Sequence, residues 1–178
     1  MAESGIDGAK NLFIRRWGEM AATWGISRTM AEIHAMLYLS PEPVCTDDVM
    51  DQLEVSRGSA STNLRQLLNW GLIQREHRRG DRKEYFEAEK DVWLMFETII
   101  RERRRRELQP IVETLERCVE LASEGPRSKS DTVTKAYTKR FSDILDLCNA
   151  MNAVFNVVNK AGRRGLKPLT KALSVLAK

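Results

Sequence analysis

Residues 55–88 read VSRGSASTNLRQLLNWGLIQREHRRGDRKEYFEA. Ser56 is placed to cap a helix, because its side-chain oxygen can accept hydrogen bonds from the free N–H groups of the first turn. Apolar residues at helical spacing form the inward stripe of this helix: Leu64, Leu67 and Leu68. Gly71 follows as the expected left-handed C-cap. The stretch therefore begins with a predicted helix that ends sharply at Gly71.

Two short strands are predicted after this helix. Leu72-Ile73 and Tyr85-Phe86 are apolar pairs of the kind that strands contain, and residues 78–83 between them read RRGDRK. A glycine and an aspartate in such a segment favour a hairpin turn. A helix, a sharp stop and a basic hairpin are the closing elements of a winged helix-turn-helix.

The helix face opposite the leucines is small, polar and free of carboxylates. A surface that enters a DNA major groove needs small residues for close approach, and donors for phosphates and base edges. The candidate DNA-binding residues of the helix-turn-helix are Thr46, Ser56, Arg57, Ser59, Ser61, Thr62, Asn63, Arg65 and Gln66. Those of the hairpin are Arg78, Arg79, Arg82 and Lys83.

Positive charge is concentrated in this stretch. Residues 56–83 hold seven Lys or Arg and two acids, a net of +5, whereas the whole chain of 178 residues carries only +4. A local basic surface predicts polyanion binding better than a high isoelectric point does. An ordinary solvated basic surface is the alternative, and it leaves the agreement of helix, stop, hairpin and charge unexplained.

We expect a cytoplasmic protein that is mainly α with a small β-hairpin wing. No apolar run approaches the roughly 18–20 residues that span a bilayer, and the segment MAESGIDGAK is unlike a signal peptide. Three widely spaced cysteines and two histidines suggest neither a disulfide framework nor a metal site. We expect no cofactor and no membrane partner.

The chain divides into four expected regions. An aromatic-rich helix ends near residue 24, and it needs either a partner subunit or the C-terminal helices to pack on. Ser27 can cap a helix over about 28–39, and Thr46 can cap a shorter one before the turn that leads to Ser56. The regions are 1–24, an N-terminal helix joining the dimerisation region; 25–90, the winged helix-turn-helix; 91–122, a long connecting helix; and 131–178, a helical dimerisation region.

The C-terminal half is expected to be a helical arm. Asp91 can cap the connecting helix, Pro110 should kink or break it, and residues 101–107 are polar on every side, as in a helix that crosses solvent. A heptad seam follows, which would be costly to expose in a monomer. Together with Phe13, the predicted dimerisation residues are Phe141, Ile144, Cys148, Met151, Phe155 and Val158. Gly162 and Gly165 should end that helix.

The chain resembles the multiple-antibiotic-resistance-regulator (MarR) superfamily, and within it the GbsR-like branch. The resemblance is carried by VSRGSASTNLRQLLNWGLI at 55–73 and RRGDRKEYFEA at 78–88. It implies an obligate homodimer that reads a palindromic operator, usually as a repressor, with Ser56 to Gln66 in the major groove and Arg82 in the minor groove. Asp81 would orient Arg82.

The GbsR-like branch is associated with choline and osmoprotectant uptake, which suggests a small quaternary ammonium effector. Such cations are bound in aromatic cages, although aromatic stripes at helical spacing are more often core. The candidate ligand-binding residues are Trp17, Trp24, Trp93, Phe96 and Tyr137.

Three other function classes were weighed against a DNA-binding regulator. In a protein-interaction module the winged helix would be structural, but it would not need a concentrated positive charge. A redox-responsive regulator would use Cys45, Cys118 or Cys148, although buried cysteines are usually inert. An enzyme is not expected, because no paired carboxylates, nucleophile–base pair or phosphate-binding glycine loop is present.

Overall fold

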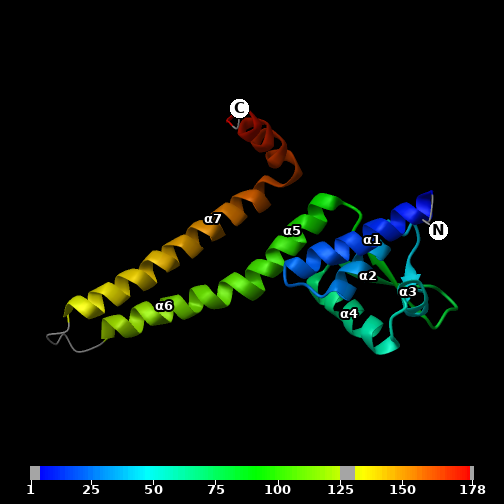
Figure 1. Ribbon diagram of the computed structural model, residues 1–178, viewed down its shortest axis with the longest axis horizontal. Coiled ribbons are helices and arrows are strands. Elements are labelled where there is room, and N and C mark those ends of the chain that lie inside the picture. The colour runs from blue at the N-terminus through cyan, green and yellow to red at the C-terminus, as the bar shows by residue number, and fades with distance from the viewer. Residues whose placement is uncertain (1–4, 125–130, 177–178) are drawn as a thin grey trace. The chain divides into compact units, whose positions relative to one another are not determined.

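The computed structural model describes residues 5–124 and 131–176, and the side chains of 158–176 are outside that description. The chain divides into two compact units, residues 1–98 and 99–178. Figure 1 labels the helices.

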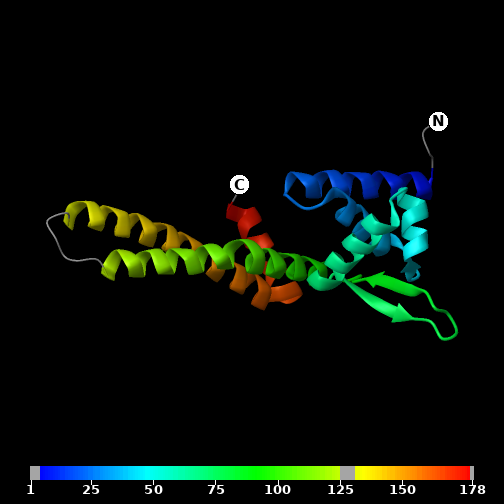
Figure 2. The ribbon, with the colours of Figure 1, turned by 90° about the horizontal axis from the view of Figure 1, so that it is seen from below.

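The first unit contains four helices and three short strands. In chain order they are α1 (Ile6–Thr23), α2 (Arg28–Leu39), β1 (Val44–Cys45), α3 (Thr46–Leu53), α4 (Arg57–Trp70), β2 (Ile73–His77) and β3 (Glu84–Ala88). The strands form one antiparallel sheet in the order β1-β3-β2. Figure 2 shows β2 and β3 extending as a hairpin, which is the wing. The predicted mainly helical winged helix-turn-helix is confirmed.

The sheet has one strand more than the sequence predicted. β1 pairs with β3, with Val44 opposite Phe86 and Cys45 opposite Tyr85. Both β1 residues are buried, so this strand fixes the root of the wing against the start of α3. Two residues after Pro43 are too short a run to show strand periodicity, and the pairing comes from a distant segment.

The core of this unit lies between α2, α3 and α4. Its largest fully buried side chains are Ile33, Leu37, Val49, Leu64 and Leu67, each at most 2% exposed. The predicted leucine stripe of α4 therefore points inward. Close packing of these branched side chains holds α4 with its polar face outward.

Two polar features complete the packing around α2. The Lys90 ammonium donates hydrogen bonds to the carbonyl oxygens of Leu37 (2.8 Å), Tyr38 (3.0 Å) and Ser40 (2.6 Å). It thus satisfies carbonyls that the end of a helix leaves unpaired. His34 is 3% exposed in the same helix, and burial, with a smaller contribution from Lys90, lowers its pKa to about 4.

Helix α1 packs on α2 through its small residues. Gly18 and Ala21 are its buried positions, and a Cβ at Gly18 would lie 2.6 Å from Glu32 Cγ. The bulky side of α1 is more open: Phe13 stacks on Trp17 with ring centroids 5.4 Å apart, and Trp24 is 61% exposed. The expected packing partner of this helix was another subunit or the C-terminal helices, whereas α2 supplies one within the chain. Its place in a dimerisation region stays a prediction.

The second unit is helical and begins within α5 (Val92–Arg103), whose residues 92–98 belong to the first unit. Helix α5 leads into a π-helical turn η1 (Arg104–Leu108), then α6 (Gln109–Glu124), and α7 (Asp131–Leu176) follows. The Asp91 carboxylate accepts hydrogen bonds from the N–H groups of Trp93 (2.8 Å) and Leu94 (3.4 Å), so the predicted cap is present. Among the described helices, none is long and apolar enough to cross a membrane.

Pro110 does not break the connecting helix. It lies in the first turn of α6, where a missing N–H is tolerated. The turn before it is π-helical: the N–H of Gln109 donates to the carbonyl oxygen of Arg104, in the wider hydrogen-bond pattern of a π-helix. Gly162 and Gly165 do not end α7 either, since the helix continues to Leu176. The predicted break at Gly162 and Gly165 was wrong, and at Pro110 the structure has a π-helical turn in place of a break.

The arginine-rich segment is not a wholly solvated bridge. Glu102 is 8% exposed and accepts hydrogen bonds from Arg105 Nη2 (2.7 Å) and Arg106 Nε (3.3 Å). These two guanidinium groups, Arg105 first, hold the pKa of Glu102 below its ordinary value. Arg104 Nη1 donates to Asn156 Oδ1 on α7 at 2.6 Å. Ion pairing within the segment allows a fully polar helix to pack.

The predicted heptad seam of α7 divides between two faces. Cys148 is 7% exposed, and Phe141 and Phe155 are half-buried, on the side that packs against α6. The other predicted seam residues are exposed, Ile144 by 48% and Met151 by 43%. With Leu147 and Val154 these two form the α7 stripe, spaced 3, 4 and 3 residues apart. The Val158 side chain lies outside the described residues.

Candidate nucleic-acid interface

The helix α4 begins and ends as its sequence predicted. Ser56 Oγ accepts a hydrogen bond from the Ser59 N–H at 3.3 Å, and Gly71 adopts φ 73° and ψ 23°. The outward face carries the predicted polar residues, of which Ser59 and Ser61 are half-buried and the others exposed: Ser56, Arg57, Thr62, Arg65 and Gln66. A donor-rich helix face is thereby presented to solvent without a carboxylate of its own.

Asn63 has a different environment from its neighbours. Its side chain is on the inner side of α4, and the residue is 8% exposed. The amide donates to the Ser59 carbonyl at 2.9 Å, and its oxygen accepts from Ser27 Oγ at 3.3 Å. These bonds tie α4 to the start of α2. We therefore remove Asn63 from the candidate contact residues.

Thr46 is the first residue of α3, and the N-cap is Cys45 rather than Thr46 as predicted. The Cys45 N–H donates to Asp48 Oδ2 at 3.1 Å, so the carboxylate three residues later closes the helix start. Thr46 lies with Ser61 and Arg65 in a hollow of about 170 Å³ beside the sheet. Thr46 therefore remains a candidate contact residue beside the outward face of α4.

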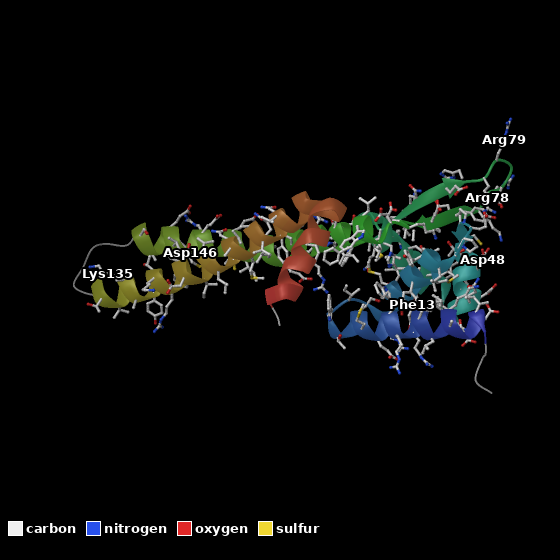
Figure 3. All side chains as sticks on the ribbon, turned by 90° about the horizontal axis from the view of Figure 1, so that it is seen from above. Phe13, Asp48, Arg78, Arg79, Lys135 and Asp146 are labelled. Carbon is white, nitrogen blue, oxygen red and sulfur yellow. The ribbon has the colours of Figure 1, made fainter. Side chains whose placement is uncertain are left out.

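The tip of the wing is a turn from Arg78 to Asp81. Gly80 has φ 86°, a left-handed conformation that favours glycine, and the Asp81 N–H bonds the Arg78 carbonyl at 3.1 Å. In Figure 3 the Arg79 side chain extends beyond the tip of the hairpin. The turn thus exposes its basic side chains.

Asp81 supports the wing backbone and does not bind the Arg82 side chain. Its carboxylate accepts from the Lys83 N–H at 2.9 Å and from the Tyr85 hydroxyl at 2.8 Å. These two bonds, in that order, hold the pKa of Asp81 below its ordinary value. The role predicted for Asp81, orienting Arg82, is replaced by that of a brace for the hairpin.

The cations of this surface fall into two groups. Four are engaged by the protein: Arg57 and Lys83 by Asp47, Arg65 by the Ser61 carbonyl, to which its Nε donates at 3.3 Å, and Arg78 by the Tyr85 ring, 4.3 Å from its centroid. Neither Arg79 nor Arg82 has a partner among the described residues. The engaged side chains hold their positive charges at fixed positions on the surface, whereas the side chains of Arg79 and Arg82 can extend away from the protein.

Asp47 is the residue that sequence reasoning missed. Its Oδ1 lies 2.6 Å from Arg57 Nη2, and its Oδ2 lies 3.1 Å from Lys83 Nζ. Lys83 first, and then Arg57, lowers the pKa of Asp47, and the same contact raises the pKa of Lys83. No sequence pattern links positions 47, 57 and 83.

The residues of the predicted aromatic cage come from three helices, α1, α5 and α7, and from both units of the chain. Trp24 is 61% exposed at the end of α1, and Tyr137 is 54% exposed on α7. Trp17 stacks on Phe13, while on α5 Trp93 is half-buried and Phe96 is 40% exposed. A cage must surround its cation, so a choline-type effector site stays a prediction.

The cysteines proposed for redox sensing are free thiols in sheltered positions. Cys45 is 3% exposed and Cys148 is 7% exposed, while Cys118 is half-buried. Reactive thiols are normally accessible and close to positive charge. Their burial favours a packing role.

Comparison with known proteins places this geometry among transcription regulators. No protein-family model matches the chain. It is 29% identical over 111 residues to the HTH-type transcriptional repressor GbsR of Bacillus subtilis, a match that covers 62% of this chain and 61% of that protein. It is 23% identical over 94 residues to YvaV, a candidate HTH-type transcriptional regulator of the same organism, covering 53% of each chain.

A solved structure extends the likeness beyond the aligned sequence. A crystal structure described as a transcriptional regulator matches with a TM-score of 0.64 and 21% identity. It covers 86% of this chain and 95% of the other, which establishes a shared fold. The sequence matches to GbsR and YvaV span less than two thirds of those proteins. The predicted resemblance to the GbsR-like branch of MarR-type winged helix-turn-helix regulators is confirmed by these similarities.

Proposed function

We propose that the chain is a transcriptional regulator that binds double-stranded DNA sequence-specifically as a homodimer. The observation that carries the proposal is the composition of one surface. The outward face of α4 and the wing together hold exposed donors and a net charge of +5 over residues 56–83. Repression is the proposed direction, because the relative GbsR is named as a repressor.

The proposed contacts follow from how each side chain is held. Arg65 and Gln66 lie on the exposed face of α4 and are suited to base edges in the major groove. Arg79 and Arg82 extend from the wing and are suited to phosphates or a minor groove. Ser56, Ser61 and Thr62 supply short donors to the backbone.

A homodimer on a palindromic operator is proposed from the second unit. The α7 stripe is an apolar surface with the spacing of a heptad seam, and its side chains are 43–61% exposed. A second copy of the same stripe is its proposed partner. Two winged helices would then be held at a fixed separation, as a palindrome requires.

The proposal is tested by measuring DNA affinity against salt concentration. A duplex selected by the wild-type protein from a random library serves as the operator, with fluorescence anisotropy as the readout. We expect the Arg65→Ala/Arg82→Ala variant to bind roughly 10- to 100-fold more weakly. Its slope of log affinity against log salt should be shallower by up to about 0.9, because Arg82 is the one of the two proposed to contact a phosphate and each lost phosphate contact removes about 0.9.

A matched control has the same change of charge outside the proposed interface. Arg16 on α1 and Lys139 on α7 are 69% and 74% exposed in their side chains. Arg16→Ala/Lys139→Ala should bind the operator like the wild type. Equal losses in the two double variants would contradict the interface and leave only a general charge effect.

A further inference from the structure

One carboxylate connects the three elements of the candidate interface. Asp47 lies in the first turn of α3, Arg57 begins α4, and Lys83 stands at the end of the wing turn. Each Asp47 oxygen engages a different cation, at 2.6 Å and 3.1 Å. The carboxylate thereby joins the recognition helix and the wing across the start of α3.

Little else fixes the wing tip relative to α4. Residues 74–84 are exposed throughout, so apolar packing does not hold them. The Arg78–Glu42 pair at 3.6 Å reaches the segment before β1, not α4. Of the ion pairs among the described residues, the Lys83–Asp47–Arg57 arrangement is the one that links the wing to α4.

Stability is a poor explanation for these two ion pairs. The side chains are 69% exposed at Arg57, 54% at Lys83 and 40% at Asp47. Exposed pairs of this kind contribute little to folding because water and salt screen them. Near DNA, a carboxylate also repels phosphates, so its presence lowers affinity for any duplex. Its benefit must lie in where it holds the two cations.

Resting on the proposed function, we infer that Asp47 is a positioning residue for DNA discrimination. It sets the spacing between Arg57 and Lys83, so that both meet phosphates together only on a duplex of the right groove shape. It also restrains binding to other sequences, because it neutralises part of the surface charge. Asp47 therefore lowers the affinity for any duplex and raises the ratio of operator affinity to non-specific affinity.

The test compares the selected operator with a scrambled duplex over a salt series. Asp47→Asn frees two cations and removes a negative charge, so its affinity for the scrambled duplex should rise, up to roughly tenfold at low salt. On the scrambled duplex, its slope of log affinity against log salt should steepen by up to about 1.8, because two phosphate contacts are added. The ratio of operator to scrambled affinity should fall several-fold. Asp47→Glu, which keeps the charge, should recover part of that ratio.

Asp51 provides the matched control. It is an exposed carboxylate one turn further along α3, and it has no partner among the described residues. Asp51→Asn makes the same charge change without breaking a tie. It should raise both affinities together and leave their ratio and the salt slope as in the wild type.

The outcomes separate this inference from the proposed function. The positioning role would be overturned if Asp47→Asn kept the wild-type ratio of operator to scrambled affinity and the wild-type salt slope. It would also be overturned if Asp51→Asn lost as much of that ratio as Asp47→Asn. A wild-type protein that binds no duplex would overturn the proposed function itself. Circular dichroism melting checks folding, and Lys83→Gln, which breaks only the wing side of the tie, should lower the ratio without altering α3.

Discussion

The two units of the chain bury their apolar side chains to very different extents. In the first unit Ile33, Leu37 and Leu67 are at most 1% exposed. In the second, the described part of α7 leaves Leu147 61% and Val154 60% exposed. Full burial of such a side chain stabilises by about 1.5–3 kcal/mol. The first unit therefore has a closed core, whereas the described part of α7 leaves an apolar stripe that the proposed dimer would cover.

The largest expected effect comes from breaking that contact. Leu147→Glu/Val154→Glu places two charges in the α7 stripe, and we expect a shift from dimer to monomer in sedimentation velocity. A monomer engages only one half-site, so operator affinity should fall by about 10²- to 10⁴-fold. Helix content by circular dichroism should be retained.

The control for the stripe adds the same charges to another exposed face of α7. Asn149 and Ala153 are exposed and lie outside the stripe, so Asn149→Glu/Ala153→Glu should stay dimeric. If the wild type sediments as a monomer at micromolar concentration, the interpretation of the stripe as a dimer surface is wrong.

The roles that could be predicted from the sequence are those that depend on neighbouring residues in the chain. Ser56, Gly71 and the basic turn act through neighbours in the chain, so their roles could be inferred from local spacing. Asn63 could not be assigned in this way, because its burial depends on Ser27, 36 residues away. The burial of the α7 seam could not be divided in this way either, since α6 decides which half of it is covered.

A matched pair of leucine truncations tests the difference in burial directly. Leu67→Ala removes a side chain that is 1% exposed, and we expect a loss of about 2–5 kcal/mol from the free energy of unfolding. Leu147→Ala, measured at a concentration where the protein is monomeric, should cost well under half as much. Urea unfolding gives both values, and equal costs would mean that the stripe is covered within one chain.

The buried His34 makes the first unit sensitive to acid. Burial lowers its pKa to about 4, against an ordinary value of 6.5 in the unfolded chain. The unfolded state therefore binds the proton more readily, and stability falls as pH drops through 6.5 towards 4. The total loss from this group is about 3 kcal/mol. Thermal melts of His34→Leu should lack this part of the pH dependence, and an unchanged profile would assign it to other groups.

The smallest expected effects concern two glycines, one near each end of α4. They distinguish the effect of backbone conformation from the effect of packing. Gly71 has φ 73° at the C-cap, and an added Cβ would meet no atom closer than 3.9 Å. Gly71→Ala should still cost about 1–2 kcal/mol, because the left-handed conformation is unfavourable for alanine. Gly58 lies inside the same helix with nothing within 4 Å, so Gly58→Ala should be neutral or stabilise by up to about 1 kcal/mol. Opposite signs in thermal melts would show that the local backbone, rather than lack of space, ends α4 where the wing begins; a neutral Gly71→Ala would assign that role to the packing of Leu72 and Ile73.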